Sequence, residues 1–105
     1  MAGIKIIKLD AKAKYQRLIS REFGSLRIKS GHVILKSGEN IGEHSTEDKE
    51  EALIILKGKG KVRIDKKDTH DIEQGMFIYI PPKTLHDVKN TGLDILEYIF
   101  TTSNI

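Results

Sequence analysis

The feature that most constrains the fold of this chain is the regular return of turn residues. From residue 24 onward, turns rich in Gly, Pro, Asn or Asp interrupt the sequence at intervals of roughly 8–12 residues, which is typical of antiparallel sheets. The segments between these turns are short and rich in Ile, Val, Leu and Tyr, which favour strands. We expect strands at residues 4–9, 26–29, 32–36, 51–57, 62–65, 69–73, 76–80, 85–89 and 95–101. The spacing predicts an all-β sandwich or barrel of antiparallel strands rather than βαβ units.

The N-terminal residues 1–23 give a weaker pattern. Residues 11–21 combine helix-favouring Ala, Lys and Leu with residues that suit a strand, so we expect strand or irregular structure with one short turn. Segments 52–56 and 76–80 carry apolar residues on both faces, so each face needs a cover. The barrel interior covers one face of each segment. The other face is covered either by residues 1–23 or by a second subunit, and a second subunit would make the protein a homodimer.

Composition narrows the classes of function. A chain of 105 residues is expected to form one domain, residues 1–105. Cysteine is absent, so any metal ligands must be nitrogen or oxygen atoms. The net charge of +3 comes without a recognition helix or a sustained basic stripe, so we expect no nucleic-acid partner. Without a long apolar run or a signal peptide, we expect a cytoplasmic protein with no membrane segment. Abundant Ile, Lys and Glu with few Asn and Gln indicate a thermophilic source.

Two glycine-framed segments, 38–58 and 75–90, contain the residues best suited to bind a metal. The first holds His44 and Glu51, and the second holds His86. Strand alternation is expected to point these three side chains from separate strands into one cavity. Two imidazoles and one carboxylate suit a divalent transition metal such as Fe, Mn, Ni, Zn or Cu. The alternative is a metal-free polar cavity in which the histidines bond to Glu51.

These two segments resemble the motifs of the cupin superfamily, in its small single-domain form with a cupin type-2 conserved barrel. The family motifs have the forms G-x5-H-x-H-x(3–4)-E-x6-G and G-x5-P-x-G-x2-H-x3-N. The positions that match in order and spacing are Gly38, His44, Glu51, Gly58, Gly75, Pro81, His86 and Asn90. The resemblance implies a double-stranded β-helix, or jelly roll, over about residues 24–102. Residues 1–23 would then form a covering strand or a dimer strand.

The sequence departs from the family pattern at two positions. Thr46 stands where the second histidine is usual, and Lys83 stands where the second motif has glycine. The first departure leaves three of the four usual ligands, and we expect the Thr46 hydroxyl to orient a metal-bound water. The second departure, Lys83 in place of glycine, is expected to affect only the conformation of the turn. Glu50 is an alternative ligand to Glu51, but the six-residue spacing to Gly58 favours Glu51.

Other side chains are candidates for the wall of the cavity. His32 points into the barrel as an auxiliary to Thr46 in one interpretation and lies at the rim or surface in the other. His70 is expected to face solvent. The candidates for the pocket lining are Arg27, Tyr79, Tyr98 and Phe100. In the alternative interpretation, the aromatic residues belong to the core and Arg27 lies on the surface.

The resemblance implies a barrel that binds a divalent metal ion and a small polar ligand. Cupins include isomerases, dioxygenases, lyases and decarboxylases, so the resemblance does not select a reaction. Whether the chain is an enzyme is therefore left open. The alternative is a metal-free or non-catalytic binding or sensor barrel, which the missing fourth ligand favours.

Overall fold

The computed structural model describes residues 3–105 as strands joined by short turns, with one 3-10 helix. The elements are β1 (Tyr15–Ile19), η1 (Arg21–Phe23), β2 (Ile28–Leu35), β3 (His44–Ser45), β4 (Lys49–Lys57), β5 (Lys59–Ile64), β6 (Asp68–Glu73), β7 (Phe77–Ile80), β8 (Leu85–Lys89) and β9 (Leu96–Asn104). In this described part, no helix has the length and apolar character needed to cross a bilayer.

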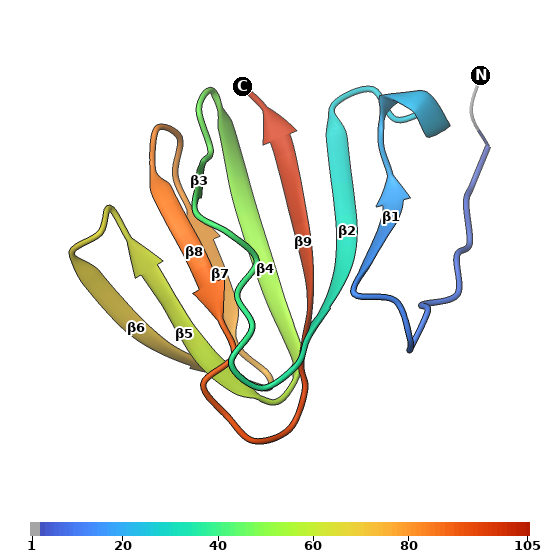
Figure 1. Ribbon diagram of the computed structural model, residues 1–105. Helices are drawn as coiled ribbons and strands as arrows, with labels where there is room; N and C mark the ends of the chain where they lie inside the picture. The colour runs from blue at the N-terminus through green and yellow to red at the C-terminus, as the bar shows by residue number, and fades with distance from the viewer. Residues whose placement is uncertain (1–2) are drawn as a thin grey trace.

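The strands form two antiparallel sheets that face each other (Figure 1). The five-stranded sheet has the order β1-β2-β9-β4-β7, and the four-stranded sheet has the order β3-β8-β5-β6. Consecutive strands often lie in different sheets, as β4 and β5 do on either side of Gly58, whose φ is 85°. This arrangement confirms the predicted jelly roll.

The hydrophobic core lies between the two sheets, where alternate residues of each strand point inward. The buried cluster includes Val33, Leu53, Val62, Val88 and Leu96, each at most 2% exposed. The same alternation places polar residues on the inward face where β4 begins. Lys49 and Glu51 share this face with Leu53.

Strand β2 is continuous, whereas the sequence predicted two strands separated by a turn at Ser30-Gly31. Gly31 pairs with Phe100 within the unbroken ladder between β2 and β9, and it also pairs with Arg17 on β1. A Cβ atom at Gly31 would lie 2.7 Å from Cζ of Phe100 and 3.3 Å from Cε2 of Tyr15. Glycine is present here because these rings occupy the space above the strand, and not because the chain turns.

The N-terminal segment also differs from the prediction. Residues 4–9 were expected to form a strand, but no strand is present between residues 3 and 14. Instead, Gln16 on β1 contacts this segment, since its amide donates to the Lys8 carbonyl and its carbonyl accepts from the Asp10 N–H. Ile4 and Ile6 remain exposed, because this part of the chain finds no strand to pair with. Figure 1 shows the segment beside β1, away from β4.

We predict that Gly31→Ala destabilises the fold. The added methyl group would push the Phe100 and Tyr15 rings from their positions, and such overpacking costs about 1–3 kcal/mol. The midpoint of thermal unfolding, measured by circular dichroism, should fall by about 4 °C or more. Gly3→Ala is the control, because nothing lies within 4 Å of a Cβ atom at Gly3. Equal unfolding midpoints for the two variants would contradict this account of Gly31.

Candidate metal centre

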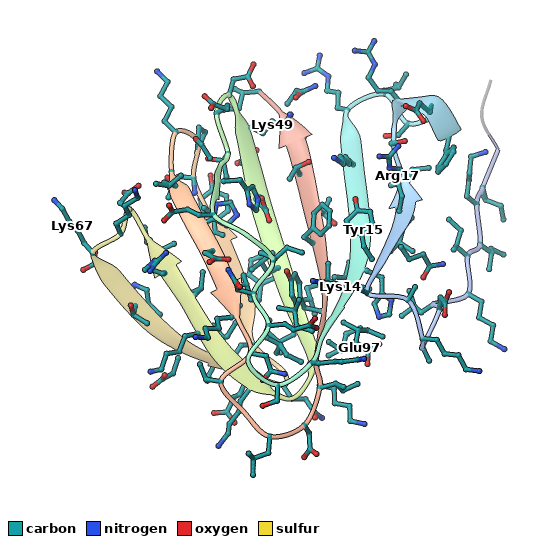
Figure 2. All side chains as sticks on the ribbon, viewed as in Figure 1. Lys14, Tyr15, Arg17, Lys49, Lys67 and Glu97 are labelled. Atoms are coloured by element: carbon teal, nitrogen blue, oxygen red, sulfur yellow. The ribbon has the colours of Figure 1, made fainter. Side chains whose placement is uncertain are left out.

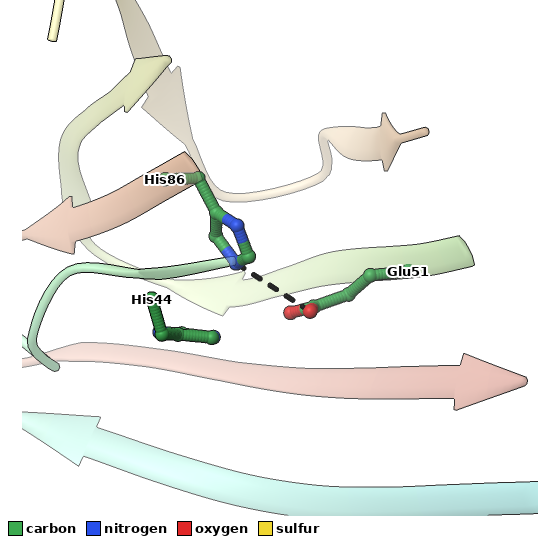
Figure 3. A group of neighbouring side chains, drawn as sticks. All are labelled: His44, Glu51 and His86. Carbon is green, nitrogen blue, oxygen red and sulfur yellow. Dashed lines mark ion pairs between the residues drawn. The ribbon is translucent and has the colours of Figure 1, made fainter. Parts of the chain in front are cut away.

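Three side chains from three strands converge at one end of the space between the sheets. His44 on β3 lies directly opposite His86 on β8 in the four-stranded sheet. Glu51 on β4 faces them from the five-stranded sheet (Figure 3). One possible ligand atom from each residue lies within 4.8 Å of the others. The arrangement can therefore hold one ion with two nitrogen atoms and one oxygen atom.

Backbone carbonyl groups orient both imidazole rings. Nδ1 of His44 lies 2.9 Å from the Gly42 carbonyl oxygen, and Nδ1 of His86 lies 3.4 Å from the Thr84 carbonyl oxygen. A carbonyl oxygen only accepts, so Nδ1 of each ring carries the proton and Nε2 keeps its lone pair. Ligand histidines in metalloproteins are commonly held in this way. Both rings thus keep Nε2 free to bind a cation.

The Nε2 atom of His86 is the strongest local indication of a missing partner. This atom is buried and makes no hydrogen bond within residues 3–105, although Oε1 of Glu51 lies 3.4 Å away. The contact is close enough for an ion pair, but its geometry does not satisfy a hydrogen bond. Buried polar atoms are nearly always satisfied, so an orphaned lone pair beside a carboxylate fits a metal ion. The residues present therefore fit a divalent metal.

Burial and charge act on His86 in opposite directions. Burial favours the neutral imidazole and lowers its pKa, while the Glu51 carboxylate favours the charged form and raises it. The Thr84 carbonyl and Asp87 add to the second effect, and the net result is a pKa raised above the usual value for histidine. In the metal-free protein, a proton is thus the competitor for the site.

Thr46 joins the loop after β3 to the loop before β8, next to the two histidines. Its hydroxyl donates to the Pro81 carbonyl over 2.8 Å and accepts the Thr84 N–H over 3.1 Å. The proton that we expected to orient a metal-bound water is therefore committed to the backbone. Lys83 donates its N–H to the Glu47 carbonyl and has a φ of 56°, a left-handed conformation that costs a non-glycine residue roughly 1–2 kcal/mol. This conformation explains why glycine is usual at its position.

The three side chains border a cavity of about 260 Å³, whose wall also includes Tyr15, Tyr98 and Phe100. Tyr98 and Phe100 were expected there from strand alternation. Burial, and then the carboxylates of Glu51 and Asp87, raise the pKa of the Tyr98 phenol, so that it stays protonated. The cavity thus combines an apolar wall with a neutral hydroxyl group and the candidate metal ligands.

Several residues considered from the sequence lie outside this cavity. His32 is fully buried on the opposite face of β2 from Val33, where its Nε2 lies 2.6 Å from Oε2 of Glu97, so it does not compensate for Thr46. Tyr79 lies on the outer face, and its hydroxyl donates to Glu50 over 2.8 Å. Glu50 therefore points away from the site.

The other two candidates, Arg27 and His70, also lie outside the cavity. Arg27 precedes β2 and lines a neighbouring hollow instead of the cavity itself. His70 lies on β6 and is exposed, as expected.

The sequence did not single out Tyr15, Lys29 or Lys49, which do line the cavity. Alternation back from Glu51 identifies Lys49, whereas Tyr15 and Lys29 required the pairing of β1, β2 and β9.

Comparisons with known proteins agree with this architecture. The sequence is 28% identical over 92 residues to the uncharacterized protein MJ0764 of Methanocaldococcus jannaschii, and the alignment covers 87% of this chain and 75% of that protein. The crystal structure of MJ0764, an RmlC-like cupin family protein with a double-stranded β-helix fold, is similar with a TM-score of 0.83 and 22% identity. That superposition covers 96% of this chain and 91% of the other.

Two further crystal structures show the same fold. A cupin protein from Bacteroides fragilis matches with a TM-score of 0.85 and 18% identity, covering 99% of this chain and 86% of its own. A Cupin 2 conserved barrel domain protein from Salinispora arenicola matches with a TM-score of 0.82 and 19% identity, and the match covers 98% of this chain and 91% of the other. A family model, described as the Cupin domain, matches residues 31–102. This match spans well over half of the sequence, and the chain therefore belongs to the cupin family.

Proposed function

We propose that this protein is a small cupin barrel that holds a divalent transition metal with His44, Glu51 and His86 and binds a small polar ligand beside it. The observation that carries the proposal is the buried Nε2 atom of His86, which lacks a hydrogen bond and faces a carboxylate and a second imidazole. The donor set suits Fe, Mn, Ni, Zn or Cu. The ion would be Lewis-acidic and would polarise an oxygen atom of the ligand.

The chain's own residues supply the rest of the binding site. Tyr98 presents a protonated hydroxyl group that can donate a hydrogen bond to a ligand. Phe100 and Tyr15 give the ligand an apolar surface, and their rings are tilted by 34° with centroids 6.0 Å apart. The cavity volume of about 260 Å³ restricts the ligand to a small molecule.

A non-catalytic binding or sensor barrel is the second candidate. The observation in its favour is the role of Thr46, which replaces the usual fourth ligand and whose proton is held by the Pro81 carbonyl. Catalysis by proton transfer needs an acid or base within reach of the substrate, and Glu51 and His86 are already committed as ligands in the proposal. Metal analysis therefore separates the candidates before any assay of turnover.

We predict that the purified protein binds about one divalent ion per chain and that removal of any one ligand weakens this binding at least tenfold. The substitutions are His44→Ala and His86→Ala, each of which removes a nitrogen donor, and Glu51→Gln, which removes the negative charge of the oxygen donor. Isothermal titration with Zn²⁺, Mn²⁺ and Ni²⁺ gives the affinity, and elemental analysis gives the stoichiometry. Metal should also raise the unfolding midpoint of the unsubstituted protein.

The matched control for this experiment is His70→Ala, because His70 is an exposed histidine on β6. Its metal affinity should equal that of the unsubstituted protein. Dialysed protein that takes up none of the three metals, or that binds them equally well after loss of a ligand, would contradict the proposed centre.

We also predict that metal affinity falls as the pH decreases. An imidazole binds a metal only in its neutral form, and the raised pKa of His86 makes protons compete at a higher pH than for an ordinary histidine. The loss of affinity should therefore begin above about pH 6.5, the usual pKa of histidine. Titrations of metal at pH 8, 7, 6 and 5 would measure it. An affinity that does not change over this range would rule out imidazole ligands.

We further propose that the protein is a homodimer that uses the outer face of β4 and β7. Ile54, Phe77 and Tyr79 lie side by side there and are 46%, 65% and 54% exposed. The N-terminal segment lies beside β1 and leaves these side chains uncovered. In contrast, the outer face of the four-stranded sheet carries charged residues such as Lys61 and Arg63. A contiguous apolar patch on only one face supports a second subunit as its cover.

We predict that Phe77→Glu converts the dimer to a monomer in sedimentation velocity experiments, because the interface would have to bury an unpaired charge. Thr69→Glu, an exposed position on the outer face of the four-stranded sheet, is the control and should remain dimeric. A monomeric unsubstituted protein, or a dimer that tolerates Phe77→Glu, would contradict the proposed interface.

A further inference from the structure

The mouth of the candidate site carries two lysines that have no carboxylate partner. Lys29 on β2 and Lys49 on β4 both line the cavity, and β9 runs between their strands. In the ladder, Lys29 lies opposite Thr102 and Lys49 lies opposite Asn104, so both side chains come from the inward face. Among residues 3–105, no carboxylate oxygen lies within 4.0 Å of either ammonium group.

A second hollow, of about 310 Å³, adjoins the cavity and shares Lys29 and Lys49 with it. Three arginines also line this hollow, namely Arg17, Arg21 and Arg27. Its one carboxylate is that of Glu22, which lies 3.3 Å from Arg17. Figure 2 shows Arg17 and Lys49 at the same end of the molecule. Five cationic side chains thus surround the approach to the cavity, against one acidic side chain.

Elsewhere on the surface, some basic side chains form ion pairs with acidic ones. Lys61 lies 2.7 Å from Asp71, and Arg63 and Lys66 both contact Glu43. The net charge of the whole chain is only +3, so the excess of positive charge at the mouth is local. A cleft lined by charges of one sign concentrates ions of the opposite sign at its entrance.

We propose that the ligand of this cavity is a small organic anion. One acidic group of the ligand would lie between Lys29 and Lys49, while an oxygen atom at its other end reaches the ion held by His44, Glu51 and His86. The two lysines stand on strands separated by two spacings of about 4.8 Å each and are offset by two residues along β9, a span over which two long side chains can still converge on one group. The arginines of the adjoining hollow draw the anion towards the entrance. This inference rests on the proposed metal centre only for the contact between the ligand and the ion, and not for the contact with the two lysines.

The test uses two anions and one neutral analogue. Protein loaded with Zn²⁺ is titrated with malonate, with inorganic phosphate and with malonamide, which has nearly the shape of malonate but no charge. We expect malonate or phosphate to bind at least tenfold more tightly than malonamide. Lys29→Met and Lys49→Met should each weaken anion binding at least about tenfold, since each removes a charged hydrogen-bond donor. The tighter of the two anions identifies the acidic group as a carboxylate or a phosphate.

Two controls separate this inference from the metal centre. Lys67→Met removes an exposed lysine from the turn between β5 and β6 and should leave anion binding unchanged. The Zn²⁺ affinity of the Lys29 and Lys49 variants should equal or exceed that of the unsubstituted protein, because a neighbouring positive charge has been removed.

Each outcome decides one of the two proposals. Zn²⁺ binding without binding of either anion, or equal binding of malonamide, would overturn the anion site and leave the metal centre intact. Anion binding that survives both lysine substitutions would also overturn it. If Zn²⁺ does not bind, the metal centre fails, and titration of the metal-free protein then tests the lysines alone. Lysine-dependent anion binding in that protein would support the site, and its absence would overturn it.

Discussion

The antiparallel register of the strands is the constraint on which the rest of the structure depends. Because side chains alternate across a strand, a shift of β4 by one residue would exchange Glu51 for Glu50 in the interior. The observed register pairs Glu51 with Ile80 on β7 and with Thr102 on β9, and it sets His44 opposite His86 in the facing sheet. The same alternation places an apolar patch on the outer face of β4 and β7. One register thus determines both the cavity and the exposed surface.

Much of the fold could be predicted because the turn signals are local. The strand at residues 85–89 matches β8, and the strands at residues 69–73 and 76–80 differ from β6 and β7 by one residue at one end. The predicted strands are wrong where contacts with residues distant in the sequence determine the local structure. Gly31 resembles a turn residue, but its lack of a side chain serves the ring of Phe100, which lies far away in the sequence. Residues 4–9 have the composition of a strand, yet no neighbouring strand pairs with them.

The candidate site was predictable to the extent that its residues follow motif spacing and alternation. These rules identify the three candidate ligands and two aromatic residues of the wall, and they distinguish Glu51 from Glu50. They do not give the pairing between sheets or the partners of individual atoms. Lys29 becomes part of the cavity only through the ladder with β9, and the role of Thr46 depends on hydrogen bonds to the loop before β8. Tertiary pairing of this kind has no local signature in one sequence.

The engagement of Thr46 has a consequence for how this site can change in evolution. A histidine at position 46 would add the fourth donor that is usual in the family, but it would remove the hydroxyl that joins the loop after β3 to Pro81 and Thr84. Each of these hydrogen bonds contributes roughly 1 kcal/mol to stability. A Thr46→His substitution would thus need compensating changes in the second loop to keep the two loops joined.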